Sequence, residues 1–176
     1  MDNAGFGSCV IFLYICGMEI KEIEGNLLDS KADIIIHQVN CQGAMNSGVA
    51  KAIREKWPIV FFKYKKYVND YSNVLGTVLP VMVTENQRVL NLFAQFNYGY
   101  DGERYTSYDA IDTCFKKVAN FCREKNIKSM ALPYHMSCDR GGANWNIITE
   151  MINQHFNDLN ITIEIWKLKK DQTETS

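Results

Sequence analysis

DIIIHQVNCQGAMNSGVAKAIREKWP, residues 33–58, predicts a buried strand that runs directly into a glycine-bearing loop and an amphipathic helix. The apolar run at residues 34–36, continued at Val39, is β-branched, which is typical of a central parallel strand covered on both faces. Apolar residues then recur at helical spacing from Val49 to Trp57, and Pro58 ends the pattern. The segment therefore predicts one strand–loop–helix unit of an α/β fold.

Polar side chains gather where this strand is expected to end: His37, Gln38, Asn40 and Gln42. Open α/β sheets bind ligands beyond the carboxyl ends of their strands. A helix N-terminus that follows a glycine loop offers free backbone N–H groups and a positive dipole end, which favour an anion. The sequence therefore predicts an anionic ligand at this edge of the sheet.

Composition limits the alternatives. A chain of 176 residues with 47% hydrophobic content indicates one domain with a sizeable core. The net charge of -1 gives no electrostatic reason for nucleic acid as the main partner. No pair of the six cysteines has C-x-x-C spacing, so neither a metal site nor a redox motif is expected, and the pattern suits a reducing intracellular compartment, cytoplasmic or nuclear.

The N-terminus carries an apolar stretch, CVIFLYIC, at residues 9–16. It is too short to span a bilayer, so no membrane association is expected. It reads either as a β-strand or as an extension before an alternative start at Met18, and we favour the extension. The expected organisation is an extension at 1–17, one domain at 18–168 and a polar tail at 169–176.

Strands and helices are expected to alternate along most of the chain. The pattern predicts a mixed, mostly parallel sheet between helices, with a possible hairpin at 78–94. Thr106, with Asp109 three residues later, is expected to cap the long helix. The expected strands are 19–23, 34–39, 78–84, 89–94, 129–132 and 161–167, and the expected helices are 47–57, 60–68, 107–125 and 144–156.

Three blocks carry a family resemblance: GNLLDSKAD at 25–33, the opening segment at 33–58, and LPYHMSCDRGGANWNII at 132–148. They resemble the macro domain, an ADP-ribose-binding α/β module. The likeness is to the branch with a VNC-x-G core, which includes terminal ADP-ribose-protein glycohydrolases, yeast-type ADP-ribose 1''-phosphate phosphatases and many phage or bacterial proteins. It implies a three-layer α/β/α fold that binds ADP-ribose or a close derivative, without a cofactor.

The resemblance assigns roles to several residues. Asn40 matches the asparagine that holds the distal ribose hydroxyls, and Asp33, with the adjacent Ile34, matches the adenine-binding position. His37 matches a histidine of the phosphatases, where it can serve as base or nucleophile. His37 and Asn40 are an odd number of positions apart, so the strand end must bend for both to reach one ligand. The three catalytic candidates are His37, Asn40 and Asp139.

Two loops are expected to hold the diphosphate through their backbone. The first comprises Gly43, Ser47, Gly48 and Val49, and the second runs from Ser137 through Cys138, Arg140 and Gly141 to Gly142. Phe96, Asn97, Tyr98 and Gly99 are expected to cover the distal ribose. Each loop is expected to precede a helix N-terminus.

The chain departs from this branch at several positions. Asn46, Ser137 and Asp139 stand where glycines are common, and Asn and Asp tolerate positive φ best among the other residues. Asp139 places a negative charge near a diphosphate, which Arg140 is expected to offset. Gln95 and Gly141 stand where the terminal glycohydrolases use a lysine and an aspartate.

The resemblance favours a hydrolase. ADP-ribose 1''-phosphate is the first expected substrate, and ADP-ribosyl groups on macromolecules are the second. One alternative is a non-catalytic reader of ADP-ribose, which the departures support. The other is a general nucleotide-binding α/β protein that shares the fold only. A monomer is expected.

Overall fold

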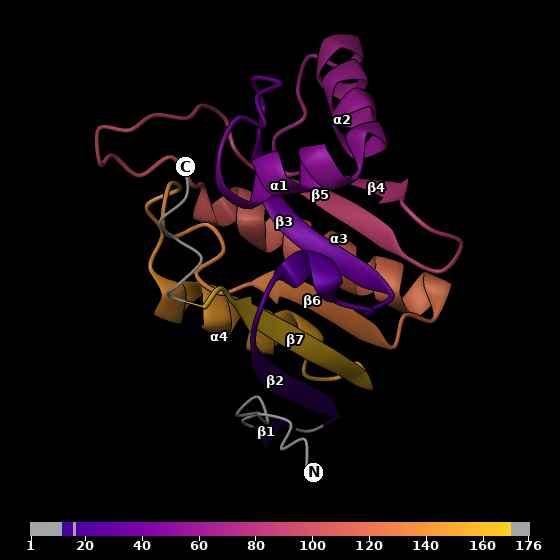
Figure 1. The fold of residues 1–176 in the computed structure, drawn as a ribbon. Coiled ribbons are helices and arrows are strands. Elements are labelled where there is room, and N and C mark those ends of the chain that lie inside the picture. Colours follow the sequence, from indigo (N-terminus) through magenta and orange to yellow (C-terminus); the bar gives the residue numbers. More distant parts are fainter. Residues whose placement is uncertain (1–11, 16, 170–176) are drawn as a thin grey trace, which may run out of the picture.

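The computed structural model describes residues 12–15 and 17–169. Within this part of the chain a single sheet of seven strands has the order β1-β2-β7-β6-β3-β5-β4 (Figure 1). The outermost strands pair antiparallel with their neighbours, and all pairings between them are parallel. The strands are β1 (Phe12–Ile15), β2 (Met18–Glu24), β3 (Ile34–Asn40), β4 (Val78–Met82), β5 (Arg88–Gln95), β6 (Ser129–Pro133) and β7 (Ile161–Lys167).

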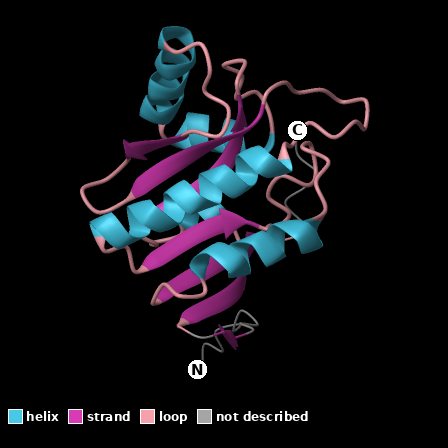
Figure 2. Ribbon diagram, turned by 180° about the vertical axis from the view of Figure 1, so that it is seen from behind, coloured by secondary structure: helices cyan, strands magenta, loops and turns pink. Residues whose placement is uncertain are grey.

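Helices cover both faces of the sheet. Figure 2 shows α3 and α4 lying along one face, and Figure 1 shows α1 and α2 on the other side. The helices are the short 3-10 helix η1 (Leu27–Asp29), α1 (Gly48–Lys56), α2 (Pro58–Asp70), α3 (Tyr108–Lys125) and α4 (Trp145–Phe156). The expected three-layer α/β/α architecture with a mixed, mostly parallel sheet is confirmed.

The central strand β3 explains the two cores. Ile34 and Ile36 belong to the cluster beneath α3 and α4, whereas Ile35 and Val39 belong to the cluster beneath α1 and α2. Alternate side chains of a strand point to opposite faces, so this isoleucine run supplies both cores at once. Burial on both faces fixes the position and register of β3 in the sheet, and this fixes the position of the polar residues at its end.

Most expected elements form within a few residues of the predicted bounds, including the β4–β5 hairpin. Phe12–Ile15 pairs with β2, so these four residues follow the strand alternative rather than the favoured extension. The rest of the expected extension, apart from Gly17, and most of the expected tail lie outside the described residues. The capping prediction is wrong: Ser107 caps α3 by accepting from the N–H of Ala110, and Thr106 is engaged elsewhere.

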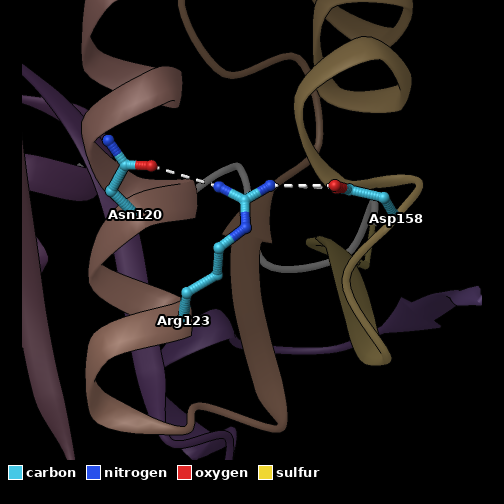
Figure 3. Close-up of polar contacts among 3 residues, drawn as sticks. All are labelled: Asn120, Arg123 and Asp158. Atoms are coloured by element: carbon cyan, nitrogen blue, oxygen red, sulfur yellow. Dashed lines mark hydrogen bonds and ion pairs between the residues drawn. The ribbon is translucent and has the colours of Figure 1, made fainter.

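An exposed polar cluster joins α3 to the turn after α4 (Figure 3). The Arg123 guanidinium donates to both carboxylate oxygens of Asp158, at 3.1 and 3.0 Å, and to Asn120 Oδ1 at 3.1 Å. Such exposed ion pairs contribute little to stability. No helix in the described part of the chain is both long and apolar enough to cross a bilayer.

Candidate functional site

A cavity of about 540 Å³ lies at one edge of the sheet. It is lined by the carboxyl ends of all five central strands, or by the residues directly after them: Gly25 after β2, Asn40 of β3, Gln95 of β5, Pro133 of β6 and Lys167 of β7. Parallel strands bring these ends together. The volume and the mixture of apolar walls with a few polar groups are typical of a small-ligand site.

The N-terminus of α1 faces this cavity. Ser47 is the N-cap residue but makes no capping hydrogen bond, and Ser47, Gly48, Val49 and Ala50 all line the cavity. Within the described residues, the N–H groups of Gly48, Val49 and Ala50 have no acceptor. Gly48 has φ of +54°, and a Cβ there would meet nothing within 4 Å, so the space beside it is open. This geometry suits an anion.

The second loop supplies another row of donors. Asp139, Arg140 and Gly141 line the cavity, and their N–H groups have no acceptor among the described residues. Of the two loop residues that stand where glycines are common, Ser137 has positive φ, at 71°, and Asp139 does not. Asn46 does not adopt positive φ either, so neither of these two departures strains its loop.

The expected second helix N-terminus is not part of the site. α4 begins at Trp145, and the Asn144 side chain caps it by accepting from the N–H of Asn146. Neither Asn144 nor Trp145 lines the cavity. The second loop therefore offers backbone N–H groups without a helix dipole.

Asn40 lines the cavity, but its side chain mainly holds the first loop. Its Oδ1 accepts from the N–H of Gln42 at 2.9 Å, the N–H of Ala44 at 3.3 Å and the Tyr64 hydroxyl at 2.8 Å. Its Nδ2 donates to Ala44 O at 2.8 Å. One N–H is left for a ligand, whereas the amide oxygen is already engaged, so this side chain can donate to a ligand hydroxyl.

Tyr64 of α2 was missed as a site residue. It is fully buried, and burial raises the pKa of its hydroxyl, so it stays a proton donor at neutral pH. Its hydroxyl lies 2.8 Å from Asn40 Oδ1 and 2.9 Å from Asn40 O. An apolar helical residue gives no sequence signal for such a role.

Replacing Tyr64 with phenylalanine is expected to lower the unfolding free energy by about 1 kcal/mol, because two acceptors on Asn40 lose their donor. Any ligand bound at the α1 N-terminus should weaken by several fold, since the loop loses an anchor. Tyr67→Phe is the matched control, because the Tyr67 hydroxyl does not contact Asn40. Denaturant unfolding of both variants measures the difference, and equal losses would remove Tyr64 from the loop's support.

His37 and Asn40 both line the cavity, and the irregularity beside them is an extra residue, Ala94, in the partner strand β5. The pairing of β3 with β5 shifts between Val39 and Asn40, so that Asn40 pairs with Gln95. His37 is buried, and its Nε2 lies 2.7 Å from Asn91 Oδ1. Burial lowers the pKa of His37 to about 4, although the hydrogen bond to Asn91 opposes the shift.

This pKa makes stability depend on pH. In the unfolded chain His37 binds its proton near pH 6.5, whereas in the folded chain it does so near pH 4. The unfolded state therefore binds more protons in this window, and folding stability falls as the pH is lowered through it. Wild type should lose about 3 kcal/mol more than His37→Gln between pH 6.5 and 4. An identical loss in His37→Gln would contradict the buried neutral histidine.

A hydrogen-bonded network joins strands β3 and β5 to two loops at the floor of the site. Gln38 Nε2 donates to Gln95 Oε1 at 2.6 Å and to Thr106 Oγ1 at 2.9 Å, and Thr106 Oγ1 donates to Ser137 O at 3.0 Å. Gly141 packs against it, since a Cβ there would lie 2.1 Å from Thr106 Oγ1 and 2.3 Å from Ser137 O. Gln95 is thus a structural amide where the terminal glycohydrolases have a lysine.

The assignment of Asp33 and Ile34 to the ligand is corrected. They lie at the start of β3, at the end of the strand away from the cavity. Asp33 Oδ2 accepts from the N–H groups of Lys128 and Ser129, and Ile34 is fully buried in the core. Asp33 is therefore a structural residue that joins the start of β3 to the start of β6.

Five other expected ligand residues support the loops without lining the cavity: Gly43, Phe96, Asn97, Cys138 and Gly142. Three of them hold the loops through a backbone carbonyl oxygen. Gly43 O accepts from Lys65, Phe96 O from Gln42, and Asn97 O from Gln95. Burial and the nearby Asp139 carboxylate raise the pKa of Cys138 to about 11, so this thiol is a poor nucleophile. Gly142 has φ of 69°, where a side chain would be strained.

The far end of the cavity was missed. Gly25, Asn26, Leu27 and Leu28 line it, and beside them lie Trp166, Lys167 and Leu168. Asn26 Oδ1 accepts from the N–H of Leu28 and so fixes the turn after β2. The parallel arrangement of the strands could have predicted these residues, because β2 and β7 end at the same edge of the sheet as β3.

The mouth of the cavity carries aromatic and charged side chains. The Arg140 guanidinium lies 4.7 Å from the centre of the Tyr100 ring, whose residue is 74% exposed. Asp139 is also exposed, and its Oδ1 lies 3.6 Å from Nδ1 of His135. Of the four residues expected to cover the ribose, Tyr98 and Gly99 line the cavity, together with Tyr100, whereas Phe96 and Asn97 do not.

Residues 36–152 match the family model of the macro domain. The chain belongs to the macro domain family. The match covers both glycine loops, so the resemblance to the macro domain family is confirmed.

Sequence relatives support the same family. An uncharacterized 17.5 kDa protein of Enterobacteria phage T4 is 27% identical, over 85% of this chain and 98% of that protein. A DNA ADP-ribosyl glycohydrolase of Mycobacterium tuberculosis is 23% identical, over 77% of this chain but only 38% of its own length. An ADP-ribose 1''-phosphate phosphatase of Neosartorya fischeri is 40% identical over 53 residues, which is 30% of this chain and 26% of that protein.

Solved structures share the fold. A protein of unknown function from Bacteroides thetaiotaomicron superposes with a TM-score of 0.78 at 25% identity, covering 86% of this chain and 99% of that one. The macrodomain of Mycobacterium tuberculosis DarG has a TM-score of 0.74 at 21% identity, with 84% and 96% covered. Thermosipho africanus DarTG in complex with ADP-ribose gives 0.72 at 17% identity, with 89% and 43% covered.

Proposed function

We propose that the cavity binds ADP-ribose, with its diphosphate between the α1 N-terminus and the second loop. The observation that carries this proposal is the two rows of free backbone N–H groups, one at Gly48–Ala50 and one at Asp139–Gly141, on the same cavity. Backbone donors of this kind bind phosphate oxygens. Asn40 and Tyr98 then lie toward the distal ribose, and Asn26 and Trp166 toward the adenine.

The activity that we propose is hydrolysis, of ADP-ribose 1''-phosphate first and of ADP-ribosyl groups on macromolecules second. Relatives named as a phosphatase and a glycohydrolase support a hydrolase. His37, at the position of the phosphatase histidine, lines the cavity and is the first candidate to act on the substrate. Asp139 is the second, and Arg140 is placed to meet an anion at the mouth.

A non-catalytic reader is the second candidate. Gln95 donates to Asn97 O and accepts from Gln38, so its amide is engaged where a lysine would act. Gly141 has no side chain where the glycohydrolases have an aspartate. Binding without turnover is the expected behaviour of such a site.

Two assays separate these possibilities. Calorimetry should give one saturable site for ADP-ribose and weaker binding of AMP, ATP and NAD, whereas equal binding of all four would indicate a general nucleotide site. Phosphate release from ADP-ribose 1''-phosphate should then distinguish hydrolase from reader.

The charge of Asp139 is expected to weaken ADP-ribose binding. Asp139→Asn should tighten binding by about two- to fivefold at low salt, and the gain should shrink as ionic strength rises, because the group is exposed and well screened. Glu103→Gln is the control, since Glu103 does not line the cavity. Weaker binding by Asp139→Asn would instead place this carboxylate in contact with the ligand or in the chemistry.

A further inference from the structure

The orientation of the buried Asn91 amide is fixed by its surroundings. Asn91 Nδ2 donates to Leu79 O on the neighbouring strand β4, at 3.0 Å. A carbonyl oxygen only accepts hydrogen bonds, so the amide nitrogen must face Leu79. The amide oxygen must therefore face His37, which is its register partner across β3 and β5.

This orientation determines the tautomer of His37. Asn91 Oδ1 lies 2.7 Å from His37 Nε2 and can only accept, so Nε2 carries the hydrogen. A neutral imidazole has one N–H, which leaves Nδ1 with a lone pair. Nδ1 is buried and has no partner among the described residues, yet His37 lines the cavity.

His37 also stays neutral near physiological pH. Burial is the main cause of its lowered pKa, and its one polar partner among the described residues is the uncharged Asn91. No carboxylate is hydrogen-bonded to the ring to stabilise an imidazolium. The ring is thus better suited to accept a hydrogen bond than to store a proton.

We propose that Asn91 is a positioning residue, which holds His37 in the Nε2–H tautomer so that Nδ1 accepts a hydrogen bond from a hydroxyl group in the cavity. The donor is either a ribose hydroxyl of the ligand or an attacking water. This role rests on the proposed function, because that function supplies the hydroxyl. Asn91 itself does not line the cavity, so it acts through His37.

Nitrogen NMR of the histidine ring tests the tautomer without any assay of activity. In the ligand-free full chain, Nε2 of His37 should carry the hydrogen and Nδ1 should have the chemical shift of an unprotonated nitrogen. Asn91→Ala should give a mixture of tautomers. Gln87→Ala is the matched control, because Gln87 is another buried amide with two backbone partners but no contact with His37.

The wild-type spectrum decides the tautomer even if Asn91→Ala fails to fold. An Nδ1–H tautomer in wild type, or a pure Nε2–H tautomer in folded Asn91→Ala, would overturn the assignment. Added ADP-ribose should shift the Nδ1 signal if its hydroxyl is the donor, and the 1''-phosphate should do so if the donor is water held by the substrate. No shift with either ligand, when calorimetry shows both bound, would also overturn it.

Turnover provides a separate readout. If wild type releases phosphate, Asn91→Ala should lower kcat by at least about tenfold, while the Kd for ADP-ribose changes less than about twofold. Equal loss of affinity and turnover would mean a structural role only. Wild type without turnover would refute the proposed hydrolysis, and the ring spectra would still decide the role of Asn91.

Discussion

Gly48→Glu is expected to weaken ADP-ribose binding by at least about a hundredfold, because a carboxylate would stand where the diphosphate meets the α1 N-terminus. The space beside Gly48 is open in the structure, so the side chain fits without a clash and the protein should fold. Positive φ at this position adds about 1 kcal/mol of strain. Calorimetry on the folded variant measures the effect.

Gly102→Glu is the matched control for this substitution. Gly102 also has positive φ, at +82°, and open space around it, but it does not line the cavity. It should lose similar stability and keep ADP-ribose affinity. Undiminished binding by folded Gly48→Glu would remove the diphosphate from the first loop.

Gly141→Ala should destabilise the fold by about 3 kcal/mol, because its methyl group would overlap atoms that cannot easily move. The Cβ would lie 2.3 Å from the backbone oxygen of Ser137 and 2.9 Å from Gln38 Nε2. Relief requires that the second loop separates from the Gln38–Thr106 network, so ADP-ribose affinity should fall as well. Thermal unfolding and calorimetry on one preparation measure both effects.

The control here separates crowding from backbone strain. Gly102→Ala has strain from positive φ but no close neighbour, and should cost about 1 kcal/mol. Gly141 does not have positive φ, so its whole cost comes from close packing. Similar losses in the two variants would contradict the packing role of Gly141.

Periodicity and chain composition were sufficient for the architecture. The isoleucine run at residues 34–36 is buried on both faces, and the expected helices and strands follow it in order. The loop between β3 and α1 was also predictable, because strand, glycine loop and helix are adjacent in the sequence. Such local patterns depend on few long-range contacts.

Long-range contacts explain what the sequence did not predict. The end of the cavity proposed for the adenine is lined by Asn26 and Trp166, which are brought together by the parallel pairing of β2 with β7. The Tyr64 hydroxyl donates to Asn40 Oδ1. This contact was not predicted, because the sequence of the helix shows only a core position at Tyr64. Asp33 was assigned to the adenine from the resemblance alone, but it precedes β3 at the end of the strand away from the cavity.

The most direct test of the central claim is a crystal structure of the full chain with ADP-ribose. The diphosphate oxygens should accept hydrogen bonds from the N–H groups of Gly48–Ala50 on one side and of Asp139–Gly141 on the other. The adenine should lie beside Asn26 and Trp166, and the distal ribose beside Asn40 and Tyr98. A diphosphate bound outside the two loops would contradict the account, as would a ligand in the reverse orientation.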